Sequence, residues 1–358
     1  GLEDTAFYRY NRLISHNEVG GDPQWLGGSI EDFHAANAER ARTTPFGLLG
    51  TSTHDTKRGE DVRARLVTLA EIPDEWAAHV KRWRAMLSAE RAALADPNLE
   101  YFFYQTLLGS FPASGADDDY RARVQAAMQK AAREARVHTT WGRPNQSFEA
   151  RLAAFVDAAF RSVTFMDAFT PFQRRVAKAG ASNSLLQTAL KLTVPGVPDV
   201  YQGAELWELS LVDPDNRRPV DYARRESVLT ELLDAWSRDP RATLRSCVDG
   251  WEDGRIKLLL TALLLRERAA REPLFFGEYQ PCSVSGGGEY VGAFTRRDAH
   301  SAMLVAFVRF PFARAREPGW RHARIELPGP ARSWRNVLTG EAVASRMTPV
   351  KEPSASRS

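Results

Sequence analysis

Apolar residues recur every three or four positions over much of the first 270 residues, a spacing that places them on one face of a helix. One such pattern runs from residue 57 to about residue 94, where Asp96 and Pro97 interrupt it. Further helices are predicted over residues 101–108, 120–137, 148–159, 182–192, 226–237 and 257–270. The helix over 120–137 is rich in Ala, Arg and Gln, and we expect it to be exposed.

Two short segments lack this pattern and are predicted to form strands. Residues 46–53 are a small-residue strand that ends at His54 and Asp55, and residues 194–203 form a second strand-like block. Glycines in such strands allow a ligand or a neighbouring backbone to approach closely. Between the two segments, residues 61–160 are predicted to be a helical insertion, and residues 161–270 to hold the second strand with its helices.

The pattern changes after Pro273. Short apolar or alternating stretches at 290–296, 302–310 and 322–327 are separated by Gly, Pro and charged turns, as in a β-sheet. We therefore predict a separate C-terminal β domain over residues 271–350, followed by a disordered tail, 351–358.

Composition is that of a globular protein, with 43% hydrophobic residues among 358. No apolar run is long enough for a membrane helix, so we expect no membrane partner. The two cysteines, Cys247 and Cys282, do not make a disulfide framework or a paired-cysteine zinc site, and they fit a reducing cytoplasm. The chain begins with neither a signal peptide nor a Met, and we expect it to be part of something longer.

Charge does not indicate a nucleic-acid partner. The formal net charge is +3, and only seven of the 48 basic residues are lysines. The arginines alternate with acids instead of clustering on one basic face, which nucleic-acid binding requires.

His54 and Asp55 are the strongest candidates for chemistry, because they follow a predicted strand directly. A solvated loop pair is the simplest interpretation. Metal-dependent phosphohydrolase chemistry is a second, and it would need further ligands such as His16 and His34. In a third, the carboxylate stabilises an oxocarbenium-like transition state, the histidine donates to a sugar hydroxyl, and Lys57 and Arg58 bind an adjacent sugar.

Glycoside chemistry normally needs two working carboxylates. Glu205 is the nearest match for a second one, but its surroundings resemble a structural turn.

Aromatic residues add little to the evidence for a sugar site. Trp76 and Trp83 share a helix face and are predicted to be core rather than sugar platforms. Tyr8 and Tyr10 alternate along a predicted strand, where stacking on glucose and packing are equal alternatives.

Several motifs together resemble the maltooligosyltrehalose synthase family, in order and spacing, over about residues 1–350. The segment 195–203 (PGVPDVYQG) is shared across the wider α-amylase superfamily, whereas the run 52–58 (STHDTKR) is typical of a much narrower group and points to this one family. The other matching segments are 7–13 (FYRYNRL), 17–20 (NEVG), 60–65 (EDVRAR) and 211–221 (LVDPDNRRPVD).

The resemblance implies an α/β fold: the C-terminal part of a (β/α)8 barrel with a helical insertion, followed by an antiparallel β-sandwich domain. Residues 1–60 would hold late barrel strands and loops with the catalytic aspartate, and 161–270 the last barrel strand. The family converts the reducing-end α-1,4 bond of a maltooligosaccharide into an α,α-1,1 bond by a retaining route. That route uses an aspartate nucleophile, a glutamate acid/base and a second, stabilising aspartate, and it implies no cofactor and no metal.

By its motif, Asp55 matches the stabilising aspartate, His54 the histidine at the cleaved bond, and Lys57 a residue that holds the displaced glucose. His16, Asn17 and Asp215 are further candidates for the glucose pocket, although Asp215 is equally well explained as a turn residue.

No segment of this chain matches the family's nucleophile or acid/base. We therefore expect the chain alone to be inactive and an N-terminal half to complete it. An amylase-type hydrolase and a non-catalytic glucan-binding half are the alternatives.

Overall fold

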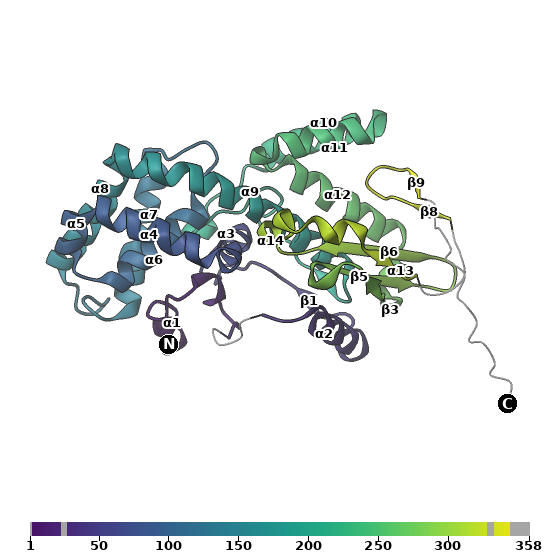
Figure 1. Cartoon of the computed structure of the whole chain (residues 1–358), viewed down its shortest axis with the longest axis horizontal. Helices are drawn as coiled ribbons and strands as arrows, with labels where there is room; N and C mark the ends of the chain where they lie inside the picture. The colour runs from purple at the N-terminus through teal and green to yellow at the C-terminus, as the bar shows by residue number, and fades with distance from the viewer. Residues whose placement is uncertain (1, 23–26, 328–332, 344–358) are drawn as a thin grey trace.

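A computed structural model describes residues 2–22, 27–327 and 333–343. The chain is mostly helical with small sheets (Figure 1). Helices α4 to α8 gather at one end, the sheet of β3, β5 and β6 lies at the other, and the 31-residue helix α9 (Val163–Thr193) lies between them. The expected tail at 351–358 lies outside the described residues, as do parts of the expected β domain.

The helical end has one apolar core, built mainly by α4 (Pro73–Met86), α5 (Ser88–Leu94), α6 (Pro97–Ser110), α7 (Asp118–Ala135) and α8 (Gln146–Arg161) with the first half of α9. Trp83 is fully buried and contacts Phe169 with ring centroids 5.4 Å apart. Trp76 and Trp83 are thus core residues, as predicted.

Polar caps set where these helices begin. The Asp96 carboxylate accepts hydrogen bonds from the backbone N–H groups of Asn98 and Leu99, and Pro97 occupies the first turn.

The expectation of an exposed helix over 120–137 is wrong. A stripe of α7 that includes Tyr120, Val124 and Met128 is buried against its neighbours, because its apolar residues recur on one face.

The two predicted strands near the motifs shorten to two residues each. β1 (Leu48–Leu49) and β2 (Val197–Pro198) pair in parallel, with Leu48 opposite Val197. Val197 N–H donates to Gly47 O at 2.9 Å, and Asp199 N–H donates to Leu49 O at 3.0 Å. The first strand therefore ends several residues before His54.

α3 (Glu60–Leu66) and η2 (Val67–Glu71) follow β1, and α12 (Arg255–Ala270) packs on α9. α10 (Tyr222–Arg238) and α11 (Pro240–Asp249) pack with α12 around a second, smaller apolar cluster that includes Leu259 and the free thiol of Cys247.

The C-terminal residues form an antiparallel sheet of β3 (Glu278–Pro281), β5 (Val291–Arg297) and β6 (Ala302–Val308), in the order β3-β5-β6. Helix α2 (Ile30–Thr43) packs on it through Phe33. This confirms strands at 290–296 and 302–310. The remaining strands are two-residue pairs: β4 (Val284–Ser285) with β7 (Arg324–Ile325), and β8 (Trp334–Arg335) with β9 (Ala342–Val343). The short helices near the sheet are α13 (Glu272–Phe276), η5 (Gly288–Tyr290), α14 (Pro311–Arg316) and η6 (Pro318–His322).

The prediction of a strand carrying Tyr8 and Tyr10 is wrong. Helix α1 (Leu2–Phe7) ends just before them, and a turn leads to η1 (Ile14–His16). The turn buries Tyr8 against Phe102, at a centroid distance of 5.9 Å, and leaves Tyr10 exposed. Among the described residues, no helix has both the length and the apolar character needed to cross a membrane.

Candidate active site

The segment between β1 and α3 presents His54 and Asp55 to open space. Their side chains are 56% and 65% exposed, and His54 Nε2 lies 3.3 Å from Asp55 Oδ2. A local turn shapes the segment: the Thr56 hydroxyl donates to Thr53 O at 2.7 Å, and Asp55 N–H donates to Thr53 Oγ1 at 3.2 Å. The carboxylate and the imidazole are thus neighbours on a tight turn, and both can reach a ligand.

Asn216 supports this turn from below. It lies in η3 (Asp215–Arg217) and is 7% exposed. Its side-chain amide donates to His54 O at 3.0 Å and to Thr56 O at 3.3 Å. Asn216 lies in the motif 211–221, but no role was predicted for it. The contact joins residues 162 positions apart, so no local sequence pattern predicts it.

Asp215, a predicted pocket residue, is already engaged by the protein. Arg123 on α7 donates to both of its carboxylate oxygens, at 2.5 and 2.7 Å, and Leu211 N–H donates to it at 2.7 Å. Its side chain is 10% exposed. In this structure Asp215 ties the loop before Asn216 to the helical region.

Lys57 points toward the N-terminal helix instead of into open space. Its Nζ donates to Asp4 Oδ1 at 2.8 Å, and its side chain is 12% exposed. This hydrogen bond lowers the pKa of Asp4 to about 2. Lys57 N–H also donates to both oxygens of the buried Glu18 carboxylate, at 2.8 and 2.9 Å. Glu18 had no predicted role, although it lies in a quoted motif.

Arg58 and Asn17 lie beneath the site rather than in it. Arg58 is 5% exposed, and its guanidinium donates to Ile14 O at 2.8 Å and to Asn17 O at 2.9 Å. The Asn17 amide is fully buried and donates to Phe7 O at 2.9 Å and to Tyr10 O at 2.6 Å. Both residues use their donors to fold the N-terminal loop under the turn, and a contact of either with substrate stays a prediction.

His16 is half-buried and lines a cavity of about 1020 Å³ between the N-terminal loop, α4 and the C-terminal sheet region. Neither His54 nor Asp55 lines this cavity. The exposed carboxylate and imidazole lie on the motif turn, outside this cavity. Glu205, weighed as a second carboxylate, is ion-paired with Arg225 at 3.1 Å.

His16 and His34, considered as metal ligands, lie in different parts of the structure. His34 lies on α2, and its Nδ1 is 2.7 Å from the Tyr279 hydroxyl of the C-terminal sheet. Burial lowers the pKa of His34. Within the described ranges, no group of three or more His, Cys, Asp or Glu residues could hold a metal ion.

No family model matches the chain. A protein of Mycobacterium tuberculosis, provisionally named maltooligosyl trehalose synthase, is 39% identical over 353 residues, which are 98% of this chain and 42% of the relative.

Solved structures point the same way. The maltooligosyltrehalose synthase of Arthrobacter ramosus superposes with a TM-score of 0.78 at 37% identity, over 96% of this chain and 42% of that one. A protein of Sulfolobus tokodaii, provisionally assigned the same name, gives 0.73 at 34% identity, over 95% and 42%. The chain thus spans about two fifths of its relatives' length. The sequence and the fold thus match maltooligosyltrehalose synthases over nearly all of the residues of this chain.

Proposed function

We propose that this chain is the C-terminal part of a (1→4)-α-D-glucan 1-α-D-glucosylmutase in trehalose biosynthesis. The enzyme converts the reducing-end α-1,4 bond of a maltooligosaccharide into an α,α-1,1 bond by intramolecular transfer. One observation carries the proposal: Asp55 and His54 lie side by side and exposed on a supported turn, in a motif characteristic of this family.

In this proposal Asp55 stabilises the oxocarbenium-like transition state by its negative charge, and His54 donates to a hydroxyl of the same sugar. Both tasks need side chains that a ligand can reach, and these two are more than half exposed. The backbone beneath them is held by Asn216, so little reorganisation is needed when the sugar binds.

Lys57 is the proposed anchor of the displaced glucose. The freed glucose has to turn within the site so that its anomeric hydroxyl attacks the glycosyl-enzyme before water does. Lys57 is fixed at both ends, by Asp4 through Nζ and by Glu18 through the backbone N–H. Two further donor positions of the ammonium group remain for sugar hydroxyls or other acceptors.

Arg58, Asn17 and Asp215 take a revised role. The side-chain donors of Arg58 and Asn17 and the carboxylate of Asp215 bond to protein atoms, and we assign these residues the positioning of the turn and its neighbouring loop. His16 remains a proposed contact of the substrate through the cavity that it lines.

We further propose that β1 and β2 are the last two strands of a (β/α)8 barrel, and that the C-terminal strands belong to a β-sandwich. Parallel strands in proteins are normally covered on both faces. Leu48 on β1 is nevertheless 77% exposed, as expected of a strand whose neighbours lie on another segment. The N-terminal half of the same enzyme is the proposed partner. It would supply the nucleophile and the acid/base, without which this chain is inactive.

A cytoplasmic location fits the two buried free thiols, Cys247 and Cys282. The substrate in this proposal is a soluble maltooligosaccharide, and the chemistry uses side chains alone.

The experiment is product analysis of maltopentaose treated with the complete protein. We expect reducing ends to be lost without release of glucose, because the new bond joins two anomeric carbons. Asp55→Asn should abolish the reaction, whereas Asp118→Asn, at a 94% exposed carboxylate on α7, should leave it unchanged. Release of glucose and shorter reducing glucans would identify an amylase-type hydrolase instead.

A further inference from the structure

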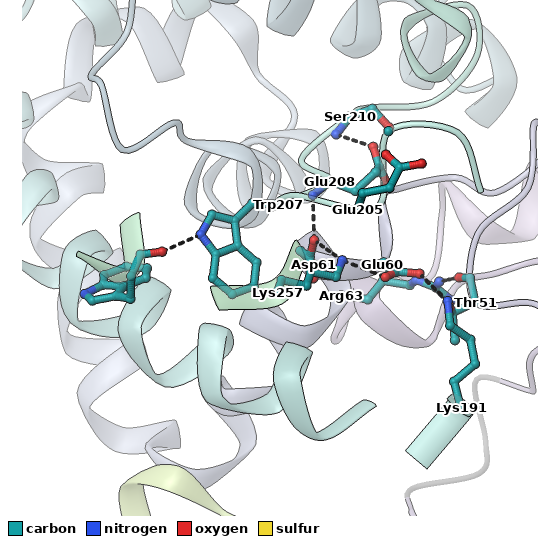
Figure 2. Close-up of polar contacts among 12 residues, drawn as sticks. Thr51, Glu60, Asp61, Arg63, Lys191, Glu205, Trp207, Glu208, Ser210 and Lys257 are labelled. Carbon is teal, nitrogen blue, oxygen red and sulfur yellow. Dashed lines mark hydrogen bonds and ion pairs between the residues drawn. The ribbon is translucent and has the colours of Figure 1, made fainter. Parts of the chain in front are cut away.

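A cluster of buried charges lies beneath the turn that carries Asp55, and Figure 2 shows its polar contacts. The buried ion cluster consists of Glu60, Asp61, Lys191 and Lys257, which are all at most 6% exposed. We propose that Lys257 is a positioning residue for the mutase reaction: its positive charge balances Glu60 and Asp61, whose carboxylates hold the two ends of segment 51–59 and thereby set the place of Asp55. This inference rests on the proposed role of Asp55.

Lys257 comes from α12 and reaches the start of α3. Its Nζ donates to Glu60 Oε1 at 2.7 Å and to Asp61 Oδ2 at 2.8 Å. The Lys257 side chain is 1% exposed. If it were removed, water could therefore hardly reach the two carboxylates to replace its hydrogen bonds. One ammonium group therefore binds two carboxylates that are adjacent in the sequence.

Glu60 carries this restraint to the upstream end of the segment. Thr51, two residues after β1, donates its hydroxyl to Glu60 Oε2. Lys191 of α9 donates to Thr51 Oγ1 at 2.7 Å and lies 3.3 Å from Glu60 Oε2. Arg63 donates to the carbonyl oxygen of Thr51. The point where the chain leaves the strand is thus attached to α3 and α9 through charged groups.

Asp61 carries the restraint to the downstream end. Its Oδ2 accepts a hydrogen bond from Glu208 N–H at 2.5 Å. Glu208 Oε1 accepts from Ser210 N–H at 2.9 Å, and Gly59 N–H donates to Ser210 O at 2.9 Å. The Glu208 loop also packs so closely on Gly59 that a Cβ there would lie 2.4 Å from Glu208 O.

The charges explain why Lys257 is needed. Burial favours the neutral form of Glu60, but the charges of Lys257 and Lys191 outweigh it and lower the pKa of Glu60 to about 2. Arg63 and Arg65 on α3, Asp199 after β2 and Glu208 are the other charged or titratable groups facing the cluster. Burial raises the pKa of Glu208. Without Lys257, Glu60 and Asp61 are two adjacent buried carboxylates with too little positive charge, so one of them has to bind a proton.

The test is Lys257→Met in the complete protein, with maltopentaose as substrate. We expect kcat for the trehalosyl product to fall by about tenfold or more at pH near 8, with KM changed by less than about threefold. The activity of the variant relative to wild type should then rise as the pH is lowered to about 5.5, because protonation of a cluster carboxylate restores the charge balance.

A charge-matched double variant, Lys257→Met with Asp61→Asn, keeps an oxygen that can accept from Glu208 N–H. We expect it to recover most of kcat and to lose the extra pH dependence. The double variant also keeps the proposal testable if the single variant does not fold. A folded, active double variant supports the proposal. A folded double variant with a kcat below about one tenth of the wild-type value overturns it.

Arg133→Met is the matched control, because Arg133 forms a similar two-bond ion pair with Glu149, at 2.8 and 2.7 Å, between α7 and α8. It should lower the melting temperature without changing the pH profile. Equal effects of the two single variants on kcat and pH profile would overturn the proposal. Retained activity of Asp55→Asn in the same assay would overturn the proposed function instead.

Discussion

The side-chain amide of Asn216 donates to the carbonyl oxygen of His54 at 3.0 Å and so joins two family motifs that lie 162 positions apart. The same amide reaches Thr56 O at 3.3 Å. One buried side chain therefore fixes the backbone on either side of Asp55. The exposed carboxylate thus lies on a turn that a buried side chain holds in place.

Asn216→Leu removes this donor from the carbonyl oxygens of His54 and Thr56. We expect a loss of about 1–3 kcal/mol in the free energy of unfolding and at least a tenfold lower kcat for the complete protein. Denaturant unfolding and steady-state kinetics measure the two effects. Asn98→Ala, which removes an exposed amide bond to Arg9 O, should leave kcat unchanged. Unaltered kcat in Asn216→Leu would contradict the positioning role.

Gly59→Ala should destabilise the chain because its methyl group would meet Glu208, with backbone O only 2.4 Å away. Backbone atoms cannot move aside as a flexible side chain can, so a loss of about 1–3 kcal/mol or more is expected. Thermal unfolding of this chain gives the measurement. Gly142, where a Cβ would meet nothing within 4 Å, provides the control in Gly142→Ala. Equal stability of the two variants would show that the close approach to Glu208 is unimportant.

The depressed pKa of Glu60 predicts a definite pH dependence. Because its folded pKa is about 2, below the ordinary value of 4.5, ionised Glu60 contributes stability that is fully present above about pH 5. That contribution is lost as the pH falls toward about 2. The difference in free energy of unfolding between wild type and Glu60→Gln should therefore be constant near neutral pH and shrink in acid. A difference that grows in acid would contradict the assignment.

Leu48→Glu tests the proposed contact with an N-terminal half. Leu48 is 77% exposed here, so the charge should change the stability of this chain by less than about 0.5 kcal/mol. It should nevertheless prevent the chain from restoring activity to the N-terminal half, because a buried unpaired carboxylate is costly. Val163→Glu, at a similarly exposed apolar position that starts α9, should restore activity normally. Restoration by Leu48→Glu would count against burial of β1.

Much of the helical architecture could be predicted from the sequence, because apolar periodicity and caps are local. The helix over 101–108 and the core positions of Trp76 and Trp83 followed from spacing alone. The turn at Tyr8 and Tyr10 was not predicted, because two alternating tyrosines resemble a strand. The contact of Tyr8 with Phe102, which favours the turn, cannot be read from the sequence. α7 was misjudged because its arginines and alanines concealed a narrow apolar stripe.

The exposed members of the site were predictable, and their supports were not. His54 and Asp55 stand in a recognisable motif, whereas Arg58 and Asn17 stand in motifs too but turn inward. A motif marks residues that matter without saying which way they point. Lys257 is the one lysine within the apolar run of α12, a signal of a paired buried charge, but its partners lie 196 and 197 positions away.

In the proposed function, this chain supplies one carboxylate, Asp55, to an active site whose other carboxylates lie on an N-terminal half. The most direct measurement is formation of a non-reducing product from maltopentaose by this chain, by the N-terminal half, and by the two together. We predict product only from the mixture, and none when the chain carries Asp55→Asn. Product from this chain alone, or an active Asp55→Asn mixture, would contradict the account.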